Sequence, residues 1–288
     1  MNKKSGSVSF YLFFINCFLF ASQLVFFSFY TCPKNLSGVP NNIPPSVNYF
    51  IPPYYVYRLN NSYDPEPLSA ESIVSWQYRV YETAEVIAKQ TKALRIIDVG
   101  CGSGAKLSKL RDIVKELVCI DIGDNLLSVQ KEFPFVRTIE FDLNTNAAHV
   151  LSQSDLENSV IINADNIEHI PHAEKLLIVF KLWMRHANAI IVSTPDRVLH
   201  GHSSRGPPPN KAHVREWALC EFVRFYSHYG PQIFTAGWTE NNNVGRSHVT
   251  LFLVSVHENL KDSVLIPSHL YKAWALPEAL ECFLPLTV

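Results

Sequence analysis

The stretch that decides the fold lies at residues 97–107 and is Ile97-Asp98-Val99-Gly100-Cys101-Gly102-Ser103-Gly104-Ala105-Lys106-Leu107. A short apolar run ends in an aspartate, glycines follow at every second position, and a helical pattern begins after the last of them. Glycine adopts backbone conformations that other residues avoid and lets the main chain approach a ligand closely. A glycine-rich turn from strand to helix is where open α/β sheets bind ligands. We therefore expect a ligand at this turn.

The residues of this turn argue against two common phosphate-binding loops. A Walker-type cradle needs Gly-Lys-Ser or Gly-Lys-Thr, which the stretch lacks. A dinucleotide-binding loop holds a pyrophosphate, and the carboxylate of Asp98 would repel it. The turn therefore favours neither kind of phosphate site.

Short apolar segments alternate with helical patterns on both sides of this turn. We expect strands near 94–97, 117–120, 136–141, 159–164 and 189–193, and helices near 76–87, 105–116, 123–131, 147–157 and 172–186. This alternation predicts parallel strands covered by helices on both faces. Two later strand candidates, near 232–238 and 248–256, have no helix between them and should form an antiparallel hairpin. The expected fold class is α/β: a Rossmann-like, seven-stranded, mostly parallel sheet with an antiparallel edge hairpin.

The composition excludes several classes of protein. The chain has 288 residues, 47% of them hydrophobic, and a formal net charge of -1. A disordered chain would combine low hydrophobicity with high net charge. Without a basic excess we expect no nucleic-acid partner. The six cysteines lie far apart with no Cys-x-x-Cys pair, which predicts reduced thiols rather than a disulfide framework or a zinc site.

The segment from Asp98 to Gly104 resembles motif I of class I S-adenosylmethionine-dependent methyltransferases. The resemblance implies that the aspartate and the glycine loop hold the methionine end of the cofactor, whose ammonium explains the carboxylate. It also implies that Asp121, at the end of the second strand, accepts hydrogen bonds from the ribose hydroxyls. Asp142, after the third strand, would contact the adenine amino group. The residues assigned to the cofactor on this basis are Asp98, Gly100, Cys101, Gly102, Gly104, Asp121, Asp142, Leu143 and Asn163.

Further signatures lie beyond motif I, over a resemblance that extends across residues 50–256. They are Trp76-Gln77-x-x-Val80-Tyr81, Asp165-Asn166-Ile167-Glu168-His169, Ser193-Thr194-Pro195-Asp196-Arg197, Gly206-Pro207-Pro208 and His213-Val214-Arg215-Glu216-Trp217. Together they resemble a bacterial subgroup of class I methyltransferases that act on small molecules or glycans. The resemblance implies little about the methyl acceptor itself.

The second of these signatures also resembles a metal site. In ubiquinone-pathway O-methyltransferases and small-RNA 2′-O-methyltransferases, an acid-x-x-Glu-His cluster binds a divalent cation, and in the RNA enzymes a later histidine completes the site. The matching residues here are Asp165, Glu168, His169 and His213. Carboxylates and imidazoles suit Mg²⁺, Mn²⁺ or Zn²⁺, so we expect these four side chains to converge. The alternative is that Glu168 and His169 shape the helix start above the sheet and His213 hydrogen-bonds the loop. The other histidines, His172, His200 and His202, offer substitute ligands or a general base.

The function that follows from the resemblance is methyl transfer from S-adenosylmethionine to the oxygen of a small-molecule or glycan-like acceptor. Glu168, His169 and His213 are the candidate catalytic residues, because attack by a hydroxyl needs a base. The alternative is a catalytically silent, membrane-tethered binding module with the same fold. A dehydrogenase is a more distant alternative.

The amino-terminal part of the chain differs in character from the rest. No charged residue occurs from Val8 to Tyr30, and as a helix this segment is long enough to cross a bilayer. It is a membrane anchor in contact with lipid, a signal peptide, or the product of a mis-assigned start. We expect four segments: 1–32 hydrophobic, 33–68 a linker rich in proline and asparagine, 69–258 the methyltransferase domain, and 259–288 a carboxyl-terminal extension.

Two arguments conflict over the side of the membrane on which the domain lies. Lys3 and Lys4 before the apolar segment favour a cytoplasmic amino terminus, and therefore a domain outside. The cytosolic cofactor and the cysteines without a disulfide pattern favour a domain in the cytoplasm. We give the cofactor more weight and expect a membrane-associated protein with a cytoplasmic domain, or a soluble cytoplasmic protein if the start is mis-assigned.

Overall fold

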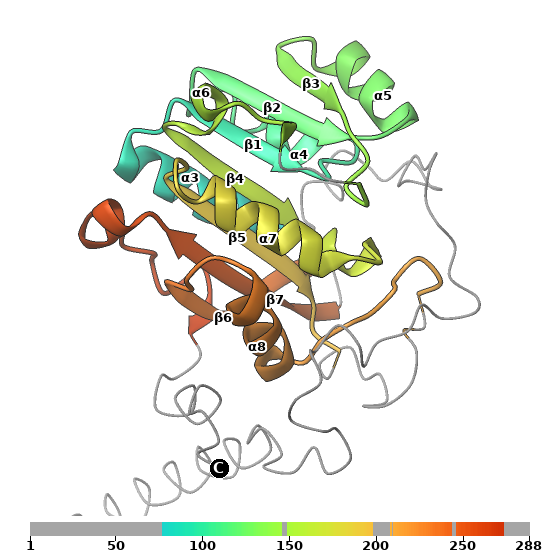
Figure 1. The fold of residues 1–288 in the computed structure, drawn as a ribbon, viewed down its shortest axis with the longest axis vertical. Coiled ribbons are helices and arrows are strands. Elements are labelled where there is room, and N and C mark those ends of the chain that lie inside the picture. Colours follow the sequence, from blue (N-terminus) through green and yellow to red (C-terminus); the bar gives the residue numbers. More distant parts are fainter. Residues whose placement is uncertain (1–76, 146–148, 198–207, 209, 244–245, 274–288) are drawn as a thin grey trace, which may run out of the picture.

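The computed structural model describes residues 77–145, 149–197, 208, 210–243 and 246–273 (Figure 1). The predicted hydrophobic segment 8–30 and the linker 33–68 lie outside these ranges. Within them, every helix is too short or too polar to cross a membrane.

The strands form one mixed sheet in the order β3-β2-β1-β4-β5-β7-β6-β8. The first five strands along the chain pair in parallel, whereas β7 pairs antiparallel with both β5 and β6. Their bounds are β1 Arg95–Val99, β2 Glu116–Asp121, β3 Val136–Glu140, β4 Ser159–Ala164, β5 Ala189–Pro195, β6 Thr235–Asn243, β7 Arg246–Val256 and β8 Lys272–Ala273. The predicted fold class is confirmed, and the two-residue strand β8 extends the sheet beyond the seven expected strands.

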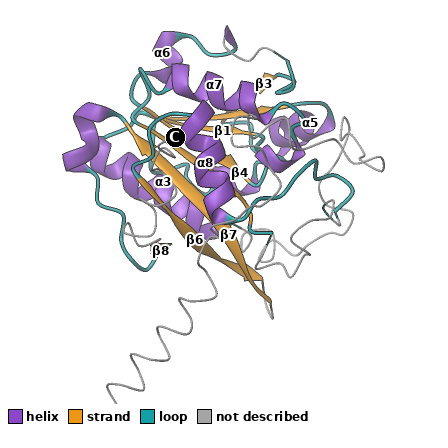
Figure 2. Cartoon of the chain, turned by 60° about the horizontal axis from the view of Figure 1, so that its bottom comes forward, coloured by secondary structure: helices purple, strands orange, loops and turns teal. Residues whose placement is uncertain are grey.

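Helices cover both faces of the sheet, as Figure 2 shows. The helices are α3 Tyr78–Thr91, α4 Ala105–Ser108, α5 Asp124–Glu132, α6 Gln153–Leu156, α7 Ala173–Trp183 and α8 Leu219–Tyr229, with 3-10 turns η3 Ile167–His169 and η4 Glu258–Ser263. The central strands are apolar on both sides: Ile96 packs in the core with α3, α4 and α5, while its neighbour Ile97 packs in the core with α6, α7 and α8. Successive strand residues point to opposite faces, so a continuous apolar run is buried on both.

Two predicted helices are shorter than expected. The helix expected over 105–116 ends at Ser108, after which backbone bonds from Leu110 to Leu107 and from Ile113 to Leu110 close three-residue turns. The helix expected over 147–157 begins only at Gln153, because Ser152 caps it by accepting from the Asp155 N–H. In both places the apolar pattern is right, but local hydrogen bonds set different ends.

Candidate active site

The glycine turn leaves β1 with a conformation that requires glycine. Gly100 has a φ of 79°, and a Cβ atom built there would lie 2.3 Å from the side chain of Asn166. That asparagine follows β4, the strand that pairs with β1 in parallel. The turn after β1 therefore lies directly against the segment after β4, and only a residue without a side chain fits between them.

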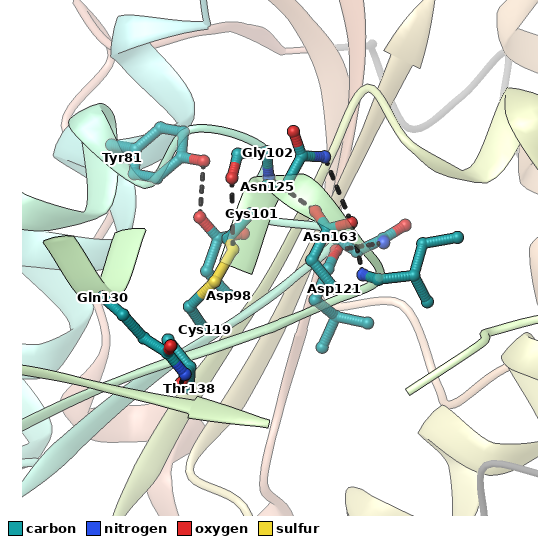
Figure 3. Close-up of a disulfide and its surroundings, with 12 residues drawn as sticks. Tyr81, Asp98, Cys101, Gly102, Cys119, Asp121, Asn125, Gln130, Thr138 and Asn163 are labelled. Atoms are coloured by element: carbon teal, nitrogen blue, oxygen red, sulfur yellow. Dashed lines mark hydrogen bonds between the residues drawn. A yellow bond between two sulfur atoms is a disulfide. The ribbon is translucent and has the colours of Figure 1, made fainter. Parts of the chain in front are cut away.

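The aspartate of the turn is buried and only half satisfied. Asp98 is fully buried, and its Oδ2 accepts a hydrogen bond from the Tyr81 hydroxyl at 2.7 Å (Figure 3). Its Oδ1 receives no hydrogen bond from the residues that the structure describes. Burial raises the pKa of Asp98 to about 7, although the bond from Tyr81 opposes this shift. A buried carboxylate oxygen without a donor favours a cationic or hydrogen-bonding ligand at this point.

The acid at the end of β2 braces the same turn. Asp121 Oδ2 accepts from the Gly102 N–H, and its Oδ1 accepts from the Ile122 N–H, both at 2.7 Å (Figure 3). Burial raises its pKa despite these bonds. The carboxylate therefore lies beside the glycine loop.

The remaining residues assigned to the cofactor lie after β3 and in β4, on either side of the β2–β1 pair. Asp142 Oδ1 accepts from the backbone and the side-chain amide of Asn144, both at 2.9 Å, within one tight turn after β3. Leu143 is buried beside it. Asn163, in β4, donates to the Val99 carbonyl at 2.7 Å, so that it ties β4 to the start of the glycine loop.

One sequence prediction is wrong here. The expectation that all six cysteines are reduced fails for Cys101 and Cys119, which the structure joins in a disulfide (Figure 3). The register of the sheet places Cys119 of β2 opposite Asp98. The glycine loop then brings the two Cα atoms within 5.5 Å, a usual separation for a disulfide. Sequence spacing alone did not reveal this proximity.

Three of the four predicted metal ligands come together. Glu168, His169 and His213 each offer a ligand atom, and these atoms all lie within 4.8 Å of one another. The two imidazole rings meet edge to face, with centroids 4.7 Å apart. Within the described part of the chain this is the only such group of three or more acidic, histidine or cysteine side chains. We call it the acid–histidine cluster.

The fourth predicted ligand is close but lies outside this group. Asp165 Oδ1 accepts from the Ser193 hydroxyl at 2.7 Å, so its carboxylate is held against β5. Its backbone has a φ of 44°, which is uncommon for a residue with a side chain. His172 is exposed and bonds to Glu174, and His200 and His202 lie outside the described residues.

Glu168 is held on two sides. Its Oε2 accepts from the Thr194 hydroxyl of β5 at 3.0 Å, and its carbonyl accepts from the Val214 N–H at 2.8 Å. The second bond fixes the segment of His213 against η3. Burial, followed by the charge of Asp165, raises the pKa of Glu168 well above its usual value.

Sequence reasoning missed the residues that hold these groups in place. Tyr81, Asn166, Thr194 and Glu216 all lie inside the quoted signatures, but each touches a partner that is distant in the chain or was not considered. A usable signal existed only for Glu216, because it follows His213 by three residues.

No protein-family model matches the chain. Among curated proteins it is similar to a probable S-adenosylmethionine-dependent methyltransferase of Mycobacterium tuberculosis, at 22% identity over 142 residues, 49% of this chain and 50% of that protein. It is also similar to the ubiquinone biosynthesis O-methyltransferase of Nitrosococcus oceani, at 26% identity over 104 residues, 36% of this chain and 44% of that protein. The chain spans about half the length of the curated relatives it matches.

Solved structures with a similar arrangement include the magnesium protoporphyrin IX methyltransferase of Synechocystis with bound SAH, at 16% identity and a TM-score of 0.44, over 68% of this chain and 90% of that chain. A SAM-dependent methyltransferase from Aquifex aeolicus has 15% identity and a TM-score of 0.46, over 67% and 94%. The curated relatives are named as S-adenosylmethionine-dependent and ubiquinone biosynthesis methyltransferases, and the chain is similar to part of each. They do not distinguish the subgroup that the downstream signatures predict.

Proposed function

We propose that this protein transfers a methyl group from S-adenosylmethionine to the hydroxyl of a small-molecule or glycan-like acceptor. The observation that carries the proposal is the contact between two sites: Asn166 packs against Gly100 of the glycine turn, and Glu168 follows it two residues later. A cofactor at the turn and an acceptor at the acid–histidine cluster would therefore be neighbours. Methyl transfer needs this proximity, because the acceptor must attack in line with the departing sulfur.

The residues of the turn fit the cofactor. Asp98 Oδ1 is a buried acceptor without a donor among the described residues, which suits the ammonium of the methionine end. Asp121 keeps acceptor capacity beside its bond to the Gly102 N–H, which suits vicinal ribose hydroxyls. S-adenosylmethionine supplies the methyl group as a sulfonium, and the protein has only to bind it and orient it.

The residues of the cluster fit a divalent cation or a general base. His169 Nδ1 lies 2.8 Å from the Ala212 carbonyl, which can only accept, so Nε2 of the neutral ring carries a lone pair. Glu168 Oε1 lies 3.9 Å from that nitrogen. Such a set would hold a divalent cation, which lowers the pKa of a bound hydroxyl. In its absence the same Nε2 would take the proton of the acceptor.

An oxygen acceptor suits the cluster better than a nitrogen one. Deprotonating a hydroxyl needs a base or a cation, and the cluster supplies carboxylate and imidazole groups for that purpose. The similarity to ubiquinone biosynthesis O-methyltransferases points the same way. The formal net charge of -1 favours a small or uncharged acceptor over a nucleic acid.

The test combines binding with turnover. S-adenosylhomocysteine should bind with micromolar affinity in calorimetry, and labelled S-adenosylmethionine should label a phenol, catechol or oligosaccharide in a panel of acceptors. Each reaction is run with Mg²⁺, Mn²⁺ or Zn²⁺ and with a chelator, which separates the cation from the histidine base.

A matched pair of variants separates the two sites. Asp121→Ala should weaken S-adenosylhomocysteine binding about 10- to 100-fold, whereas Glu168→Gln should bind S-adenosylhomocysteine normally and lose about 100-fold or more in turnover. A wild-type protein that binds no S-adenosylhomocysteine would contradict the proposal. Binding without transfer to any acceptor would instead favour the silent binding module.

A further inference from the structure

His213 contacts a carboxylate that neither the cofactor nor the acceptor is expected to touch. Its Nδ1 lies 2.6 Å from Glu216 Oε1, and both side chains are buried. An ionised carboxylate can only accept, so Nδ1 of the imidazole carries the hydrogen. The neutral ring therefore has its lone pair on Nε2.

A second and independent contact gives the same answer. The Ala212 N–H donates to Asn210 Oδ1 at 3.0 Å, which fixes the orientation of that side-chain amide. The NH₂ group of Asn210 then faces His213 Nε2 at 2.9 Å. An amide NH₂ only donates, so Nε2 must accept, and it can do so only when Nδ1 carries the hydrogen.

The two histidines of the cluster are thus set in the same tautomer by oxygen acceptors. His169 gives its Nδ1 hydrogen to the backbone carbonyl of Ala212, and His213 gives its own to a side chain. The acceptor for His169 is a main-chain carbonyl, which does not depend on which residue occupies position 212. The acceptor for His213 is a side-chain carboxylate, which depends on a glutamate at position 216. Glu216 therefore does for His213 what the backbone does for His169.

We propose that Glu216 is a positioning residue, which holds His213 in the Nδ1–H tautomer and so keeps the lone pair on Nε2 for a divalent cation shared with Glu168 and His169. The Asn210 amide occupies that lone pair in this structure, so a cation would bind there in place of the amide. This inference rests on the proposed function of the cluster and goes beyond it by naming the residue that prepares the third ligand. A carboxylate behind a ligating imidazole fixes its ring and makes the ligand nitrogen more basic. Losing such a partner typically lowers metal affinity about 10- to 100-fold.

The first measurement is the tautomer itself, read from imidazole ¹⁵N shifts of histidine-labelled protein at pH 8 without cofactor or metal. The signal of His213 is assigned by its disappearance in His213→Gln. We expect the Nδ1–H form in the wild type and in Glu216→Gln, whose amide oxygen also accepts. Because the Asn210 amide also favours this tautomer, Glu216→Ala is combined with Asn210→Ala, and the double variant should give a mixture of both tautomers. Asn210→Ala alone should keep the Nδ1–H form through Glu216. A wild-type ring in the Nε2–H form, or a mixture in Asn210→Ala alone, would overturn the proposal.

The second measurement is calorimetric titration with Zn²⁺ alone. Glu216→Ala should weaken Zn²⁺ binding about 10- to 100-fold, Glu216→Gln should restore most of it, and S-adenosylhomocysteine affinity should stay unchanged in both. The matched control is Glu221→Ala, which removes a nearby carboxylate that pairs with Arg197 instead. An equal loss of Zn²⁺ affinity in that control would show a merely structural effect and overturn the proposal.

The two measurements also separate this inference from the proposed function. A tautomer that depends on Glu216 upholds its positioning role even in a protein that transfers no methyl group. A wild type that binds no Zn²⁺ would overturn the part of the inference that concerns the cation, whatever the methyl-transfer assay shows.

Discussion

The glycine turn and the acid–histidine cluster lie at neighbouring strand ends but are built in different ways. The turn is one continuous stretch, 98–104, shaped by its own backbone and braced by Asp121. The cluster takes Glu168 and His169 from η3 and His213 from the segment before α8, and other side chains hold each of them. Substitutions in the turn therefore act through the backbone, whereas substitutions in the cluster act through side-chain partners. Cofactor affinity and acceptor chemistry should therefore respond to different substitutions.

The largest effect is expected from Gly100→Ala. The new Cβ would meet Asn166 at 2.3 Å, and the φ of 79° adds strain. Overpacking costs about 1–3 kcal/mol and a left-handed backbone about 1–2 kcal/mol. Together they predict that S-adenosylhomocysteine affinity falls by about 30-fold or more. Calorimetry measures the affinity, and circular dichroism checks the fold.

The control for this variant is Gly102→Ala. Gly102 also has a positive φ, 55°, but a Cβ there would meet nothing within 4 Å. Only the backbone strain of about 1–2 kcal/mol remains, so the loss should be about tenfold. Equal losses in the two variants would contradict the role given to Asn166.

Asp121→Ala is expected to have the next largest effect. The substitution removes the carboxylate that we propose as the acceptor for the ribose hydroxyls, and with it the bond that the Gly102 N–H donates. Hydrogen bonds to a charged group contribute about 1.5–3 kcal/mol, so S-adenosylhomocysteine affinity should fall about 10- to 100-fold. Asp142→Ala is the comparison, because part of that carboxylate is engaged by Asn144 in its own turn. A larger loss of S-adenosylhomocysteine affinity in Asp142→Ala than in Asp121→Ala would contradict the assignment of Asp121 to the ribose hydroxyls.

The affinity for S-adenosylhomocysteine should depend on pH through Asp98. Its pKa is raised to about 7 in the folded protein. The ammonium of the ligand needs the ionised carboxylate, so affinity should rise about tenfold from pH 6 to pH 8 and then level off. Asp98→Asn should remove this rise. A wild-type affinity that is flat over the same range would contradict the pairing.

The same group has an opposite effect on stability without ligand. Between pH 4 and pH 7 the folded protein keeps a proton on Asp98 that the unfolded chain has released. Its contribution to the free energy of unfolding is present below pH 4 and is lost as the pH rises through 7. Denaturant titrations at several pH values should therefore show that the free energy of unfolding changes differently with pH in the wild type and in Asp98→Asn.

The smallest effect is expected from Thr194→Val, which removes the hydroxyl that donates to Glu168. The loss of one such bond costs about 1 kcal/mol. This cost predicts a Zn²⁺ affinity that is about fivefold weaker. Thr194→Ser keeps the hydroxyl and should retain the affinity. S-adenosylhomocysteine binding should not change, and a parallel fall in both affinities would show that the two sites are not separate.

The glycine turn was predictable from the sequence because its chemistry is local. Asp98 and Gly100 lie within one turn of chain, and the alternation of strands and helices predicts the adjacent strand that ends in Asp121. The hairpin of β6 and β7 was predictable in the same way, from the missing helix between two apolar runs. The short lengths of α4 and α6 depend on individual hydrogen bonds and were not.

The partners that complete each site could not be predicted, because they depend on register. The resemblance to known metal sites identified Glu168, His169 and His213, but nothing in the sequence shows that Thr194 of β5 donates to the first of them. The disulfide between Cys101 and Cys119 has the same origin, since it follows from the offset between β1 and β2. Pattern finds the elements, and register between strands decides which side chains meet.

The left-handed backbone at Asp165 makes one substitution favourable for thermostability and unfavourable for turnover. A residue with a side chain at a φ of 44° costs folding free energy that glycine would not. Glycine would also remove the carboxylate that accepts from Ser193 and lies close enough to influence Glu168. A library selected for heat resistance alone should therefore accumulate Asp165→Gly, and one selected for turnover should retain the aspartate.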